Sequence, residues 1–499
     1  MKKNLFLLHC FLLLLLSACS GSNPPAPLTL TPETLPEKTT APPTAAPQLE
    51  PTSDQLLPGS HATAQALAEA VGTYTPDEDP STSFFRTRVS GEDQAWQGWI
   101  QEHAVSLSLM DPSGFQDLEP LKELLQDKRI VLLGEAGHNV AEIDQVKVRL
   151  VKFLHEELGY NVVAFESSML NAHLGNQILS QQQPLEAICR SIRLHWQAEQ
   201  VLPLFEYMAG NPELKLAGFD LLEDFNAGRQ VSDLIAKVDP VYAETVAALE
   251  DELDPTKNPK ILAGVLDFYK SESPHLAAAY ADLADFIDTH LEALAQASPQ
   301  NPDFPRLLRQ SAWSASQYFS RLADKDLLTW NLVSAIRDEG MAENIRFLLE
   351  EAYPDQKIIL WAHNGHIRRQ GEFDNRSSPS FSNLLQEAYG DQMYALGTLI
   401  NQGKVGNYNR QTFALPGDQA LDTAVEPLFH DALGEGSLAF LDFSGVVLQD
   451  ETRWLDLPVS SYEVGGDGPG YSQVVLAREY DGVIYIDRVT PSSDLSCPK

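Results

Sequence analysis

Short apolar runs recur along the chain and alternate with segments that have helical spacing. Val, Ile, Leu and Ala dominate four of these runs, as is typical of strands buried on both faces of a sheet. The four runs are residues 129–134, 161–165, 214–219 and 357–362. A helix with one apolar face is expected after the first run, with Gly159 as its C-terminal stop. Strands that alternate with helices predict an α/β fold with a mainly parallel central sheet flanked by helices.

The second half of the chain contains a helical portion at about residues 228–350. Its long helical segments are expected at 274–297 and 305–353, and we interpret it as a helical insertion or cap over the sheet. Strand-like runs then return within residues 392–499. They lie at 393–399, 437–443 and 482–487.

The N-terminus has the pattern of a bacterial lipoprotein precursor. Two lysines precede an apolar stretch, residues 5–16, that is too short to span a membrane comfortably. It ends in Leu-Ser-Ala-Cys, which resembles the lipobox that places diacylglycerol on the cysteine, here Cys19. An ordinary cleaved signal followed by a chance cysteine is the alternative. We therefore expect a signal peptide at 1–18 and an extracytoplasmic protein anchored to the membrane through lipid at Cys19.

A disordered tether is expected after the lipidated cysteine. Ten of the 32 prolines fall between residues 24 and 58, among Thr, Ala and Ser, so residues 19–58 cannot bury enough surface to fold. Residues 59–97 then form a lead-in to one large domain at 98–499. Export permits a disulfide between the remaining Cys189 and Cys497, but two free thiols fit the sequence equally well.

Charge excludes one class of partner. The chain has 35 Lys and Arg against 70 Asp and Glu, a formal net charge of −35, and no basic run. A nucleic-acid-binding surface has the opposite sign, so nucleic acid is not expected as a partner, and no protein partner is evident.

Ionisable side chains follow the ends of the four predicted strands. The first is followed by Glu135 and His138, the second by Glu166, the third by Asp220 and the fourth by the paired His363 and His366. The carboxyl ends of parallel strands lie along one edge of a sheet, where ligands bind in open α/β folds. A buried structural ion network is the alternative for this set of residues.

Several catalytic signatures are absent, which narrows the chemistry. The chain has no G-x-S-x-G, no H-E-x-x-H, no glycine-rich phosphate loop and no C-x-x-C. Histidine beside carboxylates suits the activation of water, because a neutral imidazole takes a proton near neutral pH. The same side chains could hold Zn or Fe, so a metal-dependent hydrolase is one alternative. A lipoprotein that binds a ligand or metal without turnover is another.

At these residues the chain resembles the erythromycin esterase family. The resemblance is carried by VLLGEAGH at 131–138, AFE at 164–166 and WAHNGH at 361–366, and it extends from about residue 98 to 490. Further matches are HWQAEQ at 195–200, GFD at 218–220, IRDEGMAEN at 336–344 and YDGVIYID at 480–487. The resemblance implies an α/β core with a helical portion, and hydrolysis of a small-molecule ester such as a macrolide lactone, with no cofactor.

The resemblance also implies roles for individual residues. His138 corresponds to the general base that activates water, and Glu135 or Glu166 would orient it. His363 and His366 would position the substrate or polarise its carbonyl. Substrate contacts are expected from four further residues, of which Lys147 stands where the family has arginine and keeps only the charge. These four are Lys147, Glu199, Asp220 and Arg337.

Overall fold

The computed structural model describes residues 93–497 except 110–113, 222–228, 254–256, 259, 261–264, 324–329, 370–378, 408–409, 418–419, 422 and 466–467. The expected signal peptide, Cys19, the tether and most of the lead-in lie outside the described residues. Within the described part of the chain, no helix is both long and apolar enough to cross a membrane.

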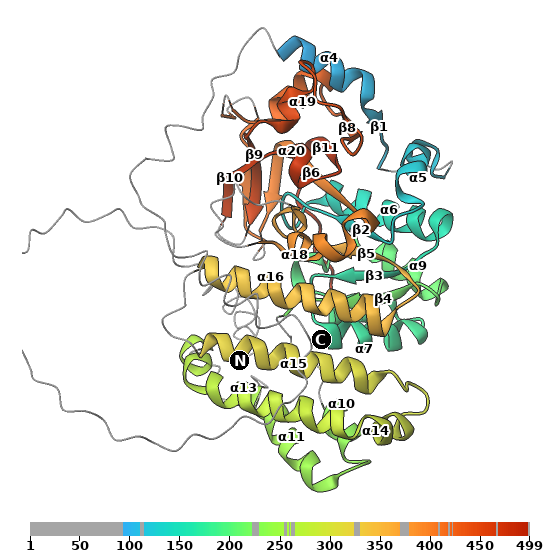
Figure 1. The fold of residues 1–499 in the computed structure, drawn as a ribbon, viewed down its shortest axis with the longest axis vertical. Helices are drawn as coiled ribbons and strands as arrows, with labels where there is room; N and C mark the ends of the chain where they lie inside the picture. The colour runs from blue at the N-terminus through green and yellow to red at the C-terminus, as the bar shows by residue number, and fades with distance from the viewer. Residues whose placement is uncertain are drawn as a thin grey trace, which may run out of the picture. The chain divides into compact units, whose positions relative to one another are not determined.

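A mixed, mostly parallel sheet forms the core, with strands in the order β1-β8-β11-β6-β2-β5-β3-β4 (Figure 1). Strands β11, β6, β2, β5, β3 and β4 pair in parallel, whereas β8 and β1 add antiparallel pairs at one edge. The predicted α/β class with a mainly parallel sheet is therefore confirmed. The bounds are β1 Val105–Ser106, β2 Ile130–Leu133, β3 Tyr160–Phe165, β4 Lys215–Gly218, β5 Lys357–Trp361, β6 Met393–Gly406, β8 Leu438–Asp442 and β11 Gly482–Val489.

All seven apolar runs form strands of this sheet, and β6 extends well beyond its run, to Gly406. There it pairs with the short antiparallel strand β7 (Thr412–Ala414). A separate hairpin is formed by β9 (Val459–Gly465) and β10 (Gly468–Val474), and Val464 of β9 donates a hydrogen bond to the Ala136 carbonyl. The hairpin therefore packs on the loop that follows β2.

Helices cover both faces of the sheet, which explains why every residue of β2 is buried. One face packs on α5 (Glu119–Leu125), α6 (Ala141–Leu158), α8 (Pro184–Ser191) and α9 (Leu202–Gly210). The other packs on α4 (Asp93–His103), α16 (Trp330–Phe347), α18 (Phe381–Tyr389) and α19 (Glu426–Leu433). Helix α6 ends as predicted at Gly159, which adopts φ 71°, a left-handed conformation that glycine takes without steric cost.

The helical portion has its own apolar core, built from α10 (Gln230–Ile235), α11 (Pro240–Leu253), α13 (Val265–Thr289), α14 (Leu291–Ala297) and α15 (Phe304–Leu322). In Figure 1, α13 and α15 run side by side next to α16. Two boundaries differ from expectation. Pro274 lies inside α13 instead of starting a helix, and the segment expected at 305–353 is divided into α15 and α16.

A disulfide joins Cys189 of α8 to Cys497, with Cα atoms 5.7 Å apart. This resolves the choice that the sequence left open, and it ties the end of the chain to a helix 308 positions earlier.

Candidate active site

The predicted catalytic residues and Asp220 lie on segments that follow β2, β3, β4 and β5. These strands are neighbours in the sheet, in the order β2-β5-β3-β4, and they are parallel. Their carboxyl ends therefore meet at one edge and bring the following loops together. Helix α17 (Asn364–Ile367) begins directly after β5, so the two histidines of that segment face the same edge.

Glu135 and His138 are directly hydrogen-bonded at this edge. Nδ1 of His138 lies 2.6 Å from Oε1 of Glu135, and both side chains are buried. Burial alone would raise the pKa of Glu135, but the Lys147 ammonium and the hydrogen bond from His138 lower it to about 2. An ionised carboxylate only accepts hydrogen bonds, so Nδ1 carries the proton and Nε2 is the basic nitrogen of the ring.

The second oxygen of Glu135 is held by a cation and by indoles. Nζ of Lys147 lies 3.0 Å from Oε2, and the indole N–H groups of Trp196 and Trp361 donate to the same oxygen at 3.1 and 3.2 Å. The ammonium also lies 4.4 Å from the centre of the Trp361 ring. Lys147 is buried against Glu135, and these contacts support a role in keeping the carboxylate charged.

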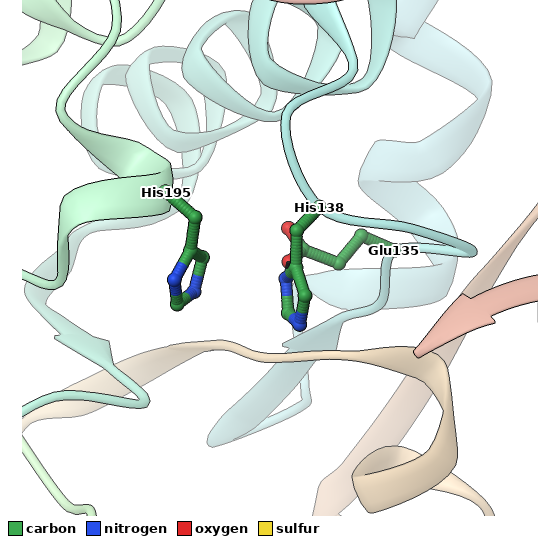
Figure 2. A group of neighbouring side chains, drawn as sticks. All are labelled: Glu135, His138 and His195. Carbon is green, nitrogen blue, oxygen red and sulfur yellow. Dashed lines mark hydrogen bonds and ion pairs between the residues drawn. The ribbon is translucent and has the colours of Figure 1, made fainter. Parts of the chain in front are cut away.

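His195 is the residue that sequence reasoning missed. It lies in the short 3-10 turn Leu194–Trp196, and its ring centre is 4.2 Å from that of His138. Figure 2 shows both rings projecting from separate loops into the same space, with the Glu135 carboxylate behind His138. Burial, followed by the neighbouring His138 and Arg193, holds the pKa of His195 well below its usual range, so this imidazole is neutral.

His195 follows no strand, which is why the strand-end argument passed over it. Its only signal in the sequence was its place in the HWQAEQ segment, which carried the family resemblance.

His363 faces His138 from the loop after β5. The two ring centres are 5.2 Å apart. Nδ1 of His363 accepts a hydrogen bond from the backbone N–H of Gly365 at 3.1 Å, so the neutral ring carries its proton on Nε2. His138 and His363 are therefore complementary, since one offers a basic Nε2 and the other an Nε2–H donor.

Glu166 supports this arrangement through the backbone of His363 and through Arg337. Its Oε2 accepts the backbone N–H of His363 at 3.1 Å, and its Oε1 forms an ion pair with Arg337. Of the two acids expected to orient His138, Glu135 is hydrogen-bonded to its ring at 2.6 Å. Burial opposes ionisation of Glu166, but Arg337 and His366 hold its pKa well below the usual range.

Asp220 and Arg337, which were both expected to contact the substrate, bind each other. Arg337 donates to Oδ1 and Oδ2 of Asp220 at 2.8 and 2.7 Å, and Arg193 adds a bond to Oδ2 at 2.6 Å. Arg193, Arg337, Asp220 and Glu166 together form a group of two arginines and two carboxylates whose charges cancel. The Arg337 side chain is 15% exposed, whereas Glu166 and Asp220 are almost fully buried, so Arg337 is the member that can still meet a ligand.

His366 is fixed by two charged neighbours. Nε2 accepts from Arg337 at 3.1 Å, which leaves the proton on Nδ1 to be donated to Asp338 at 2.8 Å. Both nitrogens of His366 are therefore engaged by charged neighbours, whereas the ring of His363 lies beside that of His138. Glu199 lies on the turn after Trp196, and its side chain is exposed.

The buried donors also raise the question of a metal. One donor atom each from Glu135, His138 and His195 can be chosen so that all lie within 4.8 Å of one another. The imidazoles fit a borderline cation such as Zn²⁺. Glu135 fits less well, because both of its oxygens already accept hydrogen bonds from His138, Lys147 or tryptophan. It resembles the outer carboxylate that orients a metal-bound histidine more than a ligand.

Comparison with known proteins identifies relatives over most of the chain. The family model described as erythromycin esterase matches residues 155–489. The putative hydrolase YbfO of Bacillus subtilis is 28% identical over 427 residues, covering 81% of this chain and 93% of the relative. Erythromycin esterase type II of Escherichia coli is 21% identical over 328 residues, covering 62% and 78%.

Solved structures share the fold at low sequence identity. A structure described as a succinoglycan biosynthesis protein superposes with a TM-score of 0.64 at 19% identity, covering 81% of this chain and 99% of that one. A mutant of the erythromycin esterase EreC in its open conformation superposes with a TM-score of 0.60 at 17% identity, covering 79% and 99%.

Proposed function

Because the chain belongs to the erythromycin esterase family of hydrolases, we propose that it hydrolyses small carboxylic esters by direct attack of an activated water. The observation that carries this proposal is the 2.6 Å hydrogen bond between His138 and an ionised Glu135 in a buried site. It leaves the basic nitrogen of His138 oriented for proton transfer, as a general base requires.

In this mechanism Nε2 of His138 takes a proton from water while the water oxygen bonds to the ester carbonyl carbon. Glu135 stabilises the imidazolium that results, because the carboxylate accepts the Nδ1 proton throughout. The tetrahedral intermediate then collapses. The bond from carbon to the alcohol oxygen breaks, and the leaving alkoxide takes the proton from the imidazolium, so the base is regenerated.

The developing negative charge on the carbonyl oxygen needs a donor, and His363 supplies one. Its Nδ1 accepts from Gly365, so the ring proton is on Nε2, and the ring centre lies 5.2 Å from that of His138. A fixed donor of this kind in a buried site stabilises an oxyanion without reorganisation. The neutral His195, whose ring centre lies 4.2 Å from that of His138, can orient the attacking water by accepting a hydrogen bond from it.

Within the class of esters, a macrolide lactone is the substrate we test first. The esterases of Escherichia coli among the relatives are named for erythromycin. The partly exposed Arg337 offers a donor for substrate oxygen, but it is already paired with Asp220 and Glu166. The lysine at position 147 alters the support of Glu135 and not the substrate contact, so it does not argue against a lactone.

The test is an ester panel that contains a macrolide lactone, run on wild-type protein and on His138→Asn. We expect the variant to lose about 10²–10⁴-fold in kcat, because general-base catalysis contributes on that order. His275→Asn is the matched control, since its side chain is 60% exposed and lies in the helical portion. Full activity of His138→Asn, at an unchanged Tm, would overturn the mechanism.

A metal-dependent hydrolase is the second candidate, supported by the convergence of donors from Glu135, His138 and His195. In that case His138 and His195 would hold the ion, which would lower the pKa of a bound water. Metal analysis of purified protein, together with the ester panel before and after chelation, separates the two candidates. Stoichiometric metal and loss of turnover on chelation would favour the metal.

We propose, finally, that the enzyme works outside the cytoplasm on a lipid anchor at Cys19. The signal-like N-terminus and the lipobox pattern support the anchor. The Cys189–Cys497 disulfide supports the compartment, because structural disulfides persist in oxidising environments and are rare in the cytosol.

A further inference from the structure

The last described residues of the chain, 490–497, cross the two loops that carry His138 and His195. We call these residues the C-terminal strap. The strap begins where β11 ends, at Val489, so one end is fixed by a central strand of the sheet. Its other end is fixed by the disulfide to α8.

On one side the strap binds the main chain next to His138. The backbone N–H of Ser492 donates to the carbonyl of Asn139 at 3.1 Å, and the N–H of Ala141 donates to the carbonyl of Thr490 at 2.9 Å. The Ser492 hydroxyl adds a 2.6 Å bond to the buried Asp144. The first of these bonds is one residue away from His138.

On the other side the strap binds the segment that follows His195. The N–H of Leu495 donates to the carbonyl of Gln197 at 3.3 Å, and the N–H of Glu199 donates to the carbonyl of Ser493 at 2.9 Å. Ala198 and Asp494 form an antiparallel bridge between these bonds. Arg410 completes the contact, since it donates to the carbonyls of Leu194 and Gln197 at 2.8 and 3.0 Å and pairs with Asp494.

The strap therefore sets the distance between two loops that come from different parts of the sequence. The His138 loop follows β2, whereas the His195 turn lies between α8 and α9. Ser493 and Asp494 are exposed, so their hydrogen bonds compete with water, and a chain end held only by such bonds frays. The disulfide prevents that fraying, and both of its cysteines are half-buried, within reach of a small dithiol.

We propose that the C-terminal strap positions His195 against His138, and that the Cys189–Cys497 disulfide makes catalysis sensitive to thiol reductants. This inference rests on the proposed function of the His138 site. Dithiothreitol would supply two electrons and two protons, break the S–S bond to two thiols, and become the cyclic disulfide. The released strap would let the His195 turn move. Displacements near 1 Å at a catalytic site cost up to about 10²-fold in rate.

The first experiment measures amide hydrogen exchange on the oxidised and the dithiothreitol-reduced full chain, with two additional thiols confirmed by titration. We expect faster exchange after reduction at 194–199 and 139–141, and unchanged exchange in β2 and β5. This readout does not need turnover, so it tests the strap even if no ester in the panel is hydrolysed. Unchanged exchange at both loops in the reduced protein would overturn the inference.

The second experiment measures kcat and KM with the best ester of the panel, at a temperature where the reduced protein remains folded by circular dichroism. Reduction should lower kcat by roughly tenfold or more, with KM nearly unchanged, because the strap contacts the catalytic loops and not the substrate. Reoxidation should restore kcat. Cys189→Ser/Cys497→Ser is the control for the reductant itself, and it should have the low kcat with and without dithiothreitol.

Arg410→Met removes the hydrogen bonds that hold the 194–197 turn and leaves the disulfide intact. We expect its kcat to fall and its response to reduction to be smaller than that of wild type, because both changes act on the position of the 194–197 turn. Equal kcat values for oxidised and reduced wild-type protein, with the two thiols present, would reject the positioning role.

Discussion

Glu135 is a buried carboxylate that stays ionised only because its surroundings supply donors and a cation. Lys147 supplies the cation, His138 and the two indoles supply the remaining donors, and together they outweigh the cost of burial. The pKa of Lys147 is itself lowered by burial, against the opposing effect of Glu135. The pair therefore depends on mutual neutralisation, and removing one partner leaves the other charge uncompensated.

Lys147→Met should expose this dependence. Without the ammonium the pKa of Glu135 rises, and a protonated Glu135 no longer stabilises the His138 imidazolium. We expect the acid limb of the kcat/KM profile to move to higher pH, and the free energy of unfolding to fall by about 3–5 kcal/mol at neutral pH.

Lys147→Arg is the matched control, since it keeps the cation, and its acid limb should remain where the wild-type limb lies. pH–rate profiles and urea unfolding of both variants check the prediction. An unshifted profile for Lys147→Met would show that Glu135 does not need the ammonium.

Asp144 behaves in the opposite way, because burial and the nearby Glu135 raise its pKa to about 8. The folded state holds a proton that the unfolded chain, with a value near 3.8, releases. Its contribution to stability is therefore complete below about pH 4 and is lost as pH rises towards 8. Asp144→Asn mimics the protonated form, so its Tm should match wild type near pH 4 and exceed it increasingly as pH rises to 8. Thermal melts of both proteins across this pH range test the prediction. If the Tm of wild type and the Tm of Asp144→Asn change with pH in parallel, the raised pKa of Asp144 is contradicted.

At the scale of elements, the strands and the meeting of their carboxyl ends were predictable, because buried parallel strands have a distinctive apolar run. The placement of Glu135, Glu166 and Asp220 at one edge followed from that alone. His195 did not, because it lies on a 3-10 turn whose position is set by tertiary contacts. The boundary at Pro274 failed for a similar reason, since packing of α13 on α15 extends the helix through the proline.

Gly134 makes a close approach between β2 and α17 possible. A Cβ at this position would lie 2.3 Å from Oδ1 of Asn364 and 2.7 Å from a methyl carbon of Ile367. Gly134→Ala should therefore push α17, with His363, away from Glu135. We expect a loss of about 1–3 kcal/mol in stability and a fall in kcat, measured by urea unfolding and steady-state kinetics. Gly159→Ala is the control: its left-handed φ of 71° makes alanine costly, but it lies far along α6, so kcat should not change.

At the scale of the whole molecule, the sequence predicts a tether at residues 19–58 ahead of the folded hydrolase. The described fold begins at Asp93, after the Pro- and Thr-rich segment that the sequence predicts to be a tether. A catalytic domain that carries its own disulfide and starts so far from Cys19 does not need the lipid in order to fold. Anchoring and catalysis should therefore be separable by a single substitution.

Cys19→Ser tests that separation. The lipobox thiol is the acceptor of the diacylglycerol, so we expect the variant, expressed in a bacterium, to lose incorporation of labelled fatty acid and to leave the membrane fraction. Its kcat per mole should equal that of wild type, because the change lies outside the folded hydrolase. Wild-type protein that is cleaved at another position and carries no label would contradict the lipid anchor and favour an ordinary secretion signal. Unequal kcat values would show instead that the N-terminal region contributes to the active site.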